Sequence, residues 1–177
     1  MMNFEFKLIF CGGLFAGKSS LIARMLGYDP FLQHVFQGEV CQIQSFSLPF
    51  GQIRLLMFDG PAHILPKTNE HIQRNFFIKS SGAFFLFDLT NQESIEELIW
   101  WNEKLQQYVP TKVEKFLIAT KADLIENEIT LSKRIFETNK ELETNNIIIT
   151  SSKTGLNIDL ALNAMVYSIL KNQDIKI

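Results

Sequence analysis

One glycine-rich stretch decides the fold, and it reads Phe10-Cys11-Gly12-Gly13-Leu14-Phe15-Ala16-Gly17-Lys18-Ser19-Ser20. From Gly12 to Ser19 it fits G-x-x-x-x-G-K-[ST], a pattern in which backbone N–H groups of a loop surround a triphosphate. In this pattern Lys18 places a positive charge beside the β- and γ-phosphates, and the Ser19 hydroxyl is a ligand of Mg²⁺. The whole run from Gly12 to Ser20 is therefore predicted to bind phosphate.

The residues on either side of this stretch support that interpretation. Residues 3–11 alternate and then become continuously apolar, as expected of a strand entering a buried sheet, and residues 20–26 read as the start of an amphipathic helix. A strand, a glycine loop and a helix place phosphates at the helix N-terminus. The alternative is an ordinary glycine turn between a strand and a helix.

Length, charge and cysteine content bound the class of protein. A chain of 177 residues is expected to form one domain over residues 1–177, and a net charge of −2 indicates no general attraction to nucleic acid or an anionic membrane. Cys11 and Cys41 have no metal-ligand spacing and predict reduced thiols in a cytoplasmic protein. No apolar run spans a membrane, and without a C-terminal cysteine we expect no lipid anchor, so any membrane association would come through a partner.

Strand and helix patterns alternate along the chain. Strands are predicted at residues 3–11, 39–48, 52–58, 83–87, 115–120 and 147–150, and helices at residues 20–26, 68–79, 91–108, 131–142 and 156–170. We therefore expect an α/β fold with a six-stranded, mostly parallel sheet, one antiparallel hairpin strand and five flanking helices. In the second helix Ile72, Phe76 and Phe77 are expected to face the core, and of Trp100 and Trp101 only one can do so.

An aspartate ends the third predicted strand. In nucleotide hydrolases with this phosphate loop, an acid at a strand end holds Mg²⁺, and Asp59 is predicted to do so. The alternative is a turn-forming aspartate, because Asp59 precedes a glycine.

The segment Thr120-Lys121-Ala122-Asp123 follows the fifth predicted strand. The Asp123 carboxylate can accept two hydrogen bonds from a guanine, from N1–H and the exocyclic amine, which adenine cannot match. The Lys121 stem can cover the flat face of the base. The alternative is a capped loop before a helix.

The segment Thr150-Ser151-Ser152-Lys153 follows the last predicted strand. Its backbone N–H groups, at Ser151 and Ser152, can meet the carbonyl oxygen of a guanine, with Lys153 nearby. The other interpretation, which is compatible with the first, is that Ser152, Lys153 or Thr154 caps the final helix.

Taken together, these ordered segments resemble the small GTPases of the Ras superfamily, and most of all the Rab branch. Phe87-Asp88-Leu89-Thr90 is similar to Y-D-V-T, Thr120-Lys121-Ala122-Asp123-Leu124 to N-K-x-D-L, and Ser151-Ser152-Lys153-Thr154-Gly155 to S-A-K-T-G. The resemblance implies a small G domain that binds GTP or GDP with Mg²⁺, uses Lys18 in hydrolysis and includes Leu124 in its base site. It also implies a monomer that switches between two states and binds protein effectors or regulators through its switch and hairpin surface.

The sequence departs from the family where the γ-phosphate would lie. The switch I threonine corresponds to Phe36, and no threonine precedes Thr68. The D-T-A-G-Q motif reads Asp59-Gly60-Pro61-Ala62-His63, so that Ala62 replaces a glycine and His63 replaces the water-orienting glutamine. His63 is a candidate for orienting the attacking water, and a solvent-exposed loop histidine is the alternative.

Two large side chains, Leu14 and Phe15, occupy phosphate-loop positions where relatives often carry glycine or serine. They are expected to crowd the γ-phosphate and the path of an arginine finger, or else simply to pack against the second switch. Three functions remain open at this point: a GTPase with slow hydrolysis, a pseudo-GTPase that binds nucleotide without significant turnover, and a different phosphate-loop enzyme such as a kinase or ATPase. The base-reading Asp123 argues against the third.

Overall fold

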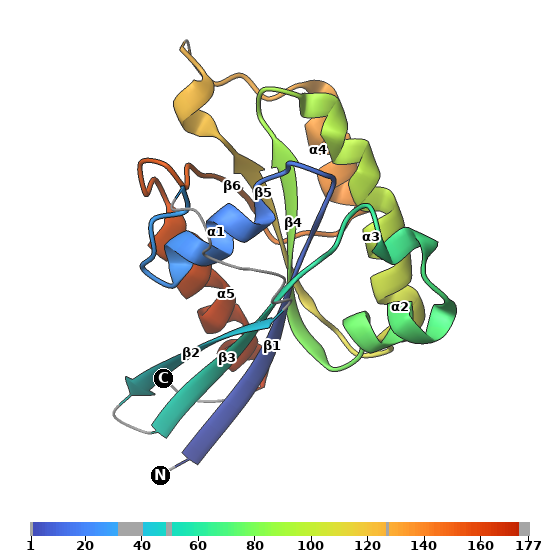
Figure 1. Cartoon of the computed structure of the whole chain (residues 1–177), viewed down its shortest axis with the longest axis vertical. Coiled ribbons are helices and arrows are strands. Elements are labelled where there is room, and N and C mark those ends of the chain that lie inside the picture. The colour runs from blue at the N-terminus through green and yellow to red at the C-terminus, as the bar shows by residue number, and fades with distance from the viewer. Residues whose placement is uncertain (1, 32–40, 49–50, 127, 174–177) are drawn as a thin grey trace.

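A single sheet forms the centre of the protein (Figure 1), whose computed structural model describes residues 2–31, 41–48, 51–126 and 128–173. In these residues six strands adjoin in the order β2-β3-β1-β4-β5-β6. The bounds are Met2–Gly12 (β1), Cys41–Leu48 (β2), Gly51–Asp59 (β3), Ser80–Asp88 (β4), Glu114–Thr120 (β5) and Ile147–Ile149 (β6). Only β2 and β3 pair antiparallel in this part of the chain, which confirms the predicted sheet.

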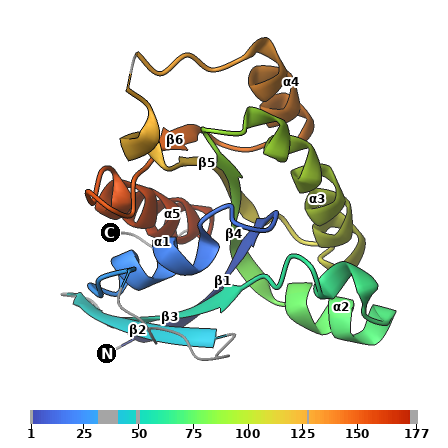
Figure 2. The ribbon, with the colours of Figure 1, turned by 45° about the horizontal axis from the view of Figure 1, so that its top comes forward.

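Five α-helices of the described chain cover the two faces of the sheet (Figure 2). They are Lys18–Met25 (α1), Glu70–Phe77 (α2), Glu97–Tyr108 (α3), Lys133–Glu141 (α4) and Ile158–Asn172 (α5). Helices α1 and α5 pack on one face, and α2, α3 and α4 on the other. None of the helices in the described ranges has the length and apolar character needed to span a bilayer.

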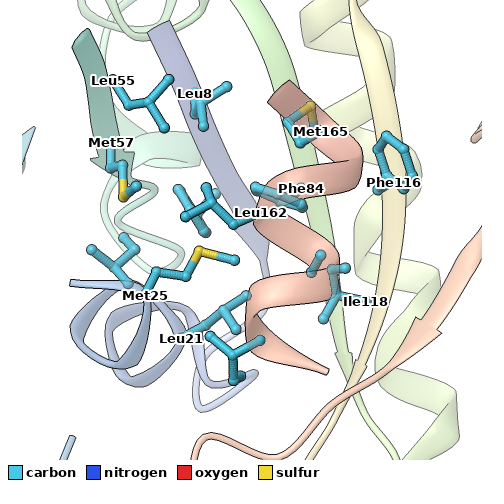
Figure 3. Packing of buried hydrophobic residues seen from close by; sticks show 14 of the residues in the cluster. Leu8, Leu21, Met25, Leu55, Met57, Phe84, Phe116, Ile118, Leu162 and Met165 are labelled. Carbon is cyan, nitrogen blue, oxygen red and sulfur yellow. The ribbon is translucent and has the colours of Figure 1, made fainter. Parts of the chain in front are cut away.

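Strand alternation divides the core into two layers. Leu8 and Phe84 point towards α1 and α5, where they meet Leu162 and Met165 (Figure 3). Ile9, the neighbour of Leu8, points to the opposite layer. Because β4 is buried on both faces, its continuous apolar run has no polar alternation. Burial of each side chain of this size contributes about 1.5–3 kcal/mol to stability. Burial therefore fixes the central strands, and with them the sheet edge at which the polar segments lie.

The structure corrects several local expectations. Ile72 is 47% exposed, so its predicted inward orientation is wrong, whereas Phe76 and Phe77 are buried as expected. Of the tryptophans, Trp101 is in the core and Trp100 is half-buried.

Two helix starts also differ from the prediction. The helix predicted from residue 91 begins as a 3-10 turn, Gln92–Glu96, before α3. The final helix begins after Asn157, so the expected capping by Ser152, Lys153 or Thr154 is wrong.

Strand register brings the polar strand ends together at one edge. Asp59 on β3 pairs with Phe10 on β1, Gly12 pairs with Leu86 on β4, and Asp88 pairs with Thr120 on β5. In open α/β sheets, ligands bind at this carboxyl edge.

Candidate functional site

The phosphate loop, defined as residues 12–19, joins the end of β1 to the start of α1. Gly12 has a φ of +153°, and a β-carbon there would lie 2.5 Å from the Leu86 carbonyl oxygen, so only glycine fits. Gly17, with a φ of 88°, is the left-handed N-cap of α1. The first turn of α1 carries no acidic side chain, and the partial positive charge of this helix end is therefore available to an anion.

The ammonium group of Lys18 lies within the loop. Its Nζ donates hydrogen bonds to the carbonyl oxygens of Gly12 at 3.1 Å and Gly13 at 2.7 Å. Burial lowers the pKa of Lys18, while the carboxylates of Asp59 and Glu97 raise it. An anion in the loop would favour the charged form of this buried amine.

The two predicted metal ligands lie in contact. The Ser19 hydroxyl, on α1, donates a hydrogen bond to Oδ2 of Asp59 at the end of β3. Burial raises the pKa of Asp59, and the hydrogen bond from Ser19 and the charge of Lys18 oppose that rise. A hydroxyl and a carboxylate are oxygen ligands that suit Mg²⁺, which completes its shell with phosphate and water oxygens. In the described residues no cluster of three or more His, Cys, Asp or Glu side chains forms an all-protein metal site.

A cavity of about 470 Å³ opens next to the phosphate loop. Its volume is within the range of small-molecule sites. The walls come from the phosphate loop, α1 and the segment after it, the end of β5 with the connection that follows, and the β6–α5 connection. The lining residues are Gly17, Ser20, Phe31, Thr120, Lys121, Asp123, Leu124, Ser152 and Lys153. All of these residues except Phe31 were predicted from the sequence, from three separate segments.

Thr120 ties the phosphate loop to the sheet. Its hydroxyl lies 2.9 Å from the carbonyl oxygen of Ala16 and 3.0 Å from that of Phe87, and the residue is buried. The hydroxyl has one proton for these two acceptors. Movement of the end of β5 is therefore coupled to the position of Ala16 in the loop.

Lys121 spans the cavity wall from a left-handed backbone position, with a φ of 62°. Its Nζ bonds Oδ2 of Asp88 at 2.6 Å, and Thr90 donates to the other oxygen of that carboxylate from its backbone N–H and its hydroxyl. Burial alone raises the pKa of Asp88, but the hydrogen bonds from Lys121 and Thr90 outweigh it and leave the pKa below its ordinary value. With its ammonium fixed, Lys121 lines the cavity with its stem.

Asp123 is oriented by a serine of the β6–α5 connection. The Ser151 hydroxyl donates a hydrogen bond to Oδ1 of Asp123 and accepts one from the backbone N–H of Thr154 at 3.2 Å. Ser151 is fully buried, and Ala122 N–H bonds the Thr150 carbonyl oxygen at 3.1 Å. These bonds join the two segments predicted to recognise a base, and no hydrogen bond from the described residues reaches Oδ2 of Asp123.

Comparison with known proteins shows the family to which this chain belongs. The sequence profile of the Ras family matches residues 7–171, most of the chain. The chain belongs to the Ras family. It is 25% identical to GTP-binding protein YPTM2 of Zea mays over 169 residues, which cover 94% of this chain and 81% of that protein. It is 26% identical to Ras-related protein RIC1 of Oryza sativa subsp. japonica over 168 residues (92% and 79%) and 23% identical to human Ras-related protein Rab-15 over 119 residues (67% and 55%). It is thus a Rab-like small GTPase of the Ras superfamily.

This Ras-family chain has an apolar phosphate-loop tip. Leu14 is 54% exposed and Phe15 is 77% exposed, so the alternative in which both pack against the second switch is wrong. Phe15 has a φ of 63°, a left-handed conformation that costs a side-chain-bearing residue about 1–2 kcal/mol. The chain thus retains a backbone suited to glycine while carrying a phenylalanine.

The second-switch segment of this Ras-family chain is anchored at one point and exposed at another. Leu65 is buried in the core, and the Gln73 amide lies 3.3 Å from the Leu65 carbonyl oxygen and 3.0 Å from that of Thr68. His63 is exposed, and Ala62 is half-buried beside it. Phe36, the candidate for the switch I position, lies outside the described residues.

Sequence reasoning missed one lining residue. Phe31, 65% exposed, forms part of the cavity wall, and its backbone N–H bonds Oδ1 of Asp29 at 2.9 Å. The sequence feature that could have predicted it is an aromatic residue directly after Asp29-Pro30, where the helix that follows the phosphate loop has ended.

Proposed function

We propose that this chain is a guanine-nucleotide-binding switch that binds GTP and GDP with Mg²⁺ and hydrolyses GTP slowly. One observation carries the proposal: the cavity beside Asp123 is continuous with the phosphate loop through Gly17 and Ser20, which line it. A base in the cavity and phosphates in the loop would therefore belong to one ligand.

Guanine is favoured over adenine by the free face of Asp123. One carboxylate oxygen is held by Ser151, which fixes the side chain in the cavity wall. The carboxylate accepts hydrogen bonds and donates none when ionised, and only guanine offers it an adjacent N–H pair. Lys121 and Phe31 then cover the base, and Leu124, Ser152 and Lys153 complete its surroundings.

The phosphates would be bound by residues 12–19 and Ser20. Lys18 would exchange its loop carbonyl partners for β- and γ-phosphate oxygens, which supply the charge that a buried ammonium needs. Ser19 and Asp59 would hold Mg²⁺, whose role is to neutralise developing phosphate charge.

Slow hydrolysis is inferred from the loop tip and the second switch. Leu14 and Phe15 project into solvent where an activating arginine would approach, and an arginine finger contributes about 10³–10⁵ to the rate. His63 is exposed on the loop after β3, where it is the candidate for orienting the attacking water. The same apolar tip favours a second candidate function, an interaction module that binds nucleotide without significant turnover.

Partners are proposed from the surface of the β2–β3 hairpin. Ile43 is 50% exposed on β2, the edge strand of the sheet, and exposed apolar side chains of this kind suit protein effectors or regulators. We further propose that residues 1–177 act as one monomeric domain and reach any membrane through such a partner.

The test is to identify the nucleotide that purified protein releases on denaturation, followed by single-turnover phosphate release after GTP loading. We expect GDP or GTP, and phosphate release that is slow but faster than hydrolysis in buffer. Lys18→Ala should lose nucleotide, whereas Lys67→Ala, an exposed lysine of the following loop, should retain it.

Each other outcome has a defined meaning. Adenine nucleotide would exclude both candidate functions. Guanine nucleotide without phosphate release above buffer would leave the binding module alone. Full retention of nucleotide by Lys18→Ala would contradict the role of the loop.

A further inference from the structure

A carboxylate stands at the end of β4, beside the cavity but not among its lining residues. The backbone N–H of Asp88 donates a hydrogen bond to the Ser94 hydroxyl at 3.0 Å, and its carbonyl oxygen accepts one from the Asn91 N–H at 3.0 Å. Thr90 donates both its N–H, at 2.9 Å, and its hydroxyl, at 2.7 Å, to Oδ1 of Asp88. These bonds fix the backbone of Asp88 and one oxygen of its carboxylate.

The other carboxylate oxygen holds the ammonium group of Lys121. Asp88 pairs in register with Thr120, the last residue of β5, and Lys121 follows with a left-handed φ of 62°. Its Nζ lies 2.6 Å from Oδ2 of Asp88, and the side chains of Lys121 and Asp88 are only 31% and 14% exposed. A left-handed residue with a β-carbon persists where its surroundings hold it, and this ion pair is one such contact.

The ion pair orders the part of Lys121 that lines the cavity. The stem of this side chain is held by the β5 connection at one end and by the Asp88 carboxylate at the other. An unpaired lysine loses rotamer freedom when a ligand packs against it, and that loss weakens binding. In Lys121 the freedom is already lost before a ligand arrives, so this wall of the cavity is preformed.

The same pair balances the charge of Lys121. Burial raises the pKa of Asp88, but the hydrogen bonds from Lys121 and Thr90 lower it further, so the carboxylate is ionised at neutral pH. The phosphate loop has positive groups of its own in Lys18 and the N-terminal end of α1. The contribution of Lys121 is therefore expected to fall on the base and not on the phosphates.

We propose that Asp88 is a positioning residue for the base-binding wall, because its carboxylate anchors the Lys121 ammonium and so holds the lysine stem where a purine ring would lie against it. The inference rests on the proposed function where it concerns a nucleotide, whereas the ion pair does not depend on it. It gives a physical role to Asp88 and Thr90, which lie outside the predicted site.

A double-mutant cycle of Asp88→Asn and Lys121→Met tests the proposal. Calorimetry on nucleotide-free protein with Mg²⁺ measures the affinity for GDP and for inorganic pyrophosphate, which has the diphosphate without the base. Asp88→Asn should weaken GDP binding about three- to tenfold and pyrophosphate binding less than about twofold. In the Lys121→Met background, which keeps the stem but has no ammonium, Asp88→Asn should change GDP affinity less than about twofold. The matched control is Asp159→Asn, the same change at an exposed aspartate of α5, which should leave both affinities unchanged.

The ratio of the two affinities separates positioning from general damage to the site. Equal weakening of GDP and pyrophosphate binding would overturn the inference, as would an effect of Asp88→Asn that persists in the Lys121→Met background. If Asp88→Asn does not fold, Thr90→Val removes one donor from the same carboxylate, and GDP affinity should again fall while pyrophosphate affinity holds.

Failure of the proposed function has a different signature. Wild-type protein that binds pyrophosphate but not GDP would refute the guanine-nucleotide switch. Melting temperatures of the same four proteins without ligand then decide on the anchor. Coupling between Asp88→Asn and Lys121→Met would support it, and additive effects would overturn it.

Discussion

Thr120→Val tests whether the base site and the phosphate loop are mechanically joined. Valine keeps the shape of threonine but removes the hydroxyl that lies 2.9 Å from Ala16 O and 3.0 Å from Phe87 O. Because the site is buried, at least one carbonyl loses its donor, at a cost of about 1–3 kcal/mol in the free energy of unfolding. If about 1.4 kcal/mol of that cost falls on the loop in its nucleotide-bound form, GDP release accelerates about tenfold.

The assays are urea unfolding and release of a fluorescent GDP analogue, with Thr120→Ser as the matched control. Serine retains the hydroxyl and loses only a methyl group, so it should lower stability by about 1 kcal/mol while leaving release close to wild type. Equal release from the valine and serine variants would refute the role given to the hydroxyl.

Three further predictions follow from groups in strained or desolvated positions. Burial raises the pKa of Asp59, so its ionised form destabilises the nucleotide-free protein once the pH exceeds the ordinary pKa of a carboxyl group. Asp59→Asn should therefore raise the melting temperature at pH 7 without nucleotide, and it should abolish the Mg²⁺ dependence of GDP binding. A lower melting temperature would contradict this account. Phe15→Gly should raise the free energy of unfolding by about 1 kcal/mol because it relieves the left-handed φ, and it should increase single-turnover GTP hydrolysis. Phe15→Ala keeps the β-carbon and should therefore gain little stability. Equal stability of the two variants would show that the backbone at this position is not strained. Burial lowers the pKa of Lys7 to about 8 from 10.5, so the wild-type protein should gain stability relative to Lys7→Met as the pH rises between these two values. If the stabilities of the two proteins changed in parallel with pH, the Lys7 amine would not be desolvated.

Most of the fold could be predicted from the sequence because local pattern and burial agree in the central strands. The continuous apolar run of β4 can only be buried on both faces, and the glycine loop requires a strand before it and a helix after it. Prediction failed where a side chain competes with the apolar pattern. In α2 the Gln73 amide is drawn into the core by backbone carbonyls of the preceding loop, and Ile72 is left exposed.

The candidate site was predictable in its motifs and not in its supporting contacts. Thr120 and Asp123 were recognisable from their place after β5, but the hydroxyl of Ser151 on Asp123 depends on two loops meeting in space. The proximity of the Glu97 carboxyl group to Gly13 likewise joins residues far apart in sequence, and its charge gave no signal beside Glu93, Glu96 and Glu103. Periodicity and motif spacing report on neighbours along the chain, whereas these contacts depend on the packing of α3 and the β6–α5 connection.

Asp123 and the phosphate loop are proposed together to hold a guanine nucleotide. The most direct measurement is the affinity for GDP and for ADP, by calorimetry on nucleotide-free protein with Mg²⁺. Two hydrogen bonds to a carboxylate, each contributing about 1.5–3 kcal/mol, predict that GDP binds at least about a hundredfold more tightly than ADP. Equal affinities, or tighter binding of ADP, would contradict the account.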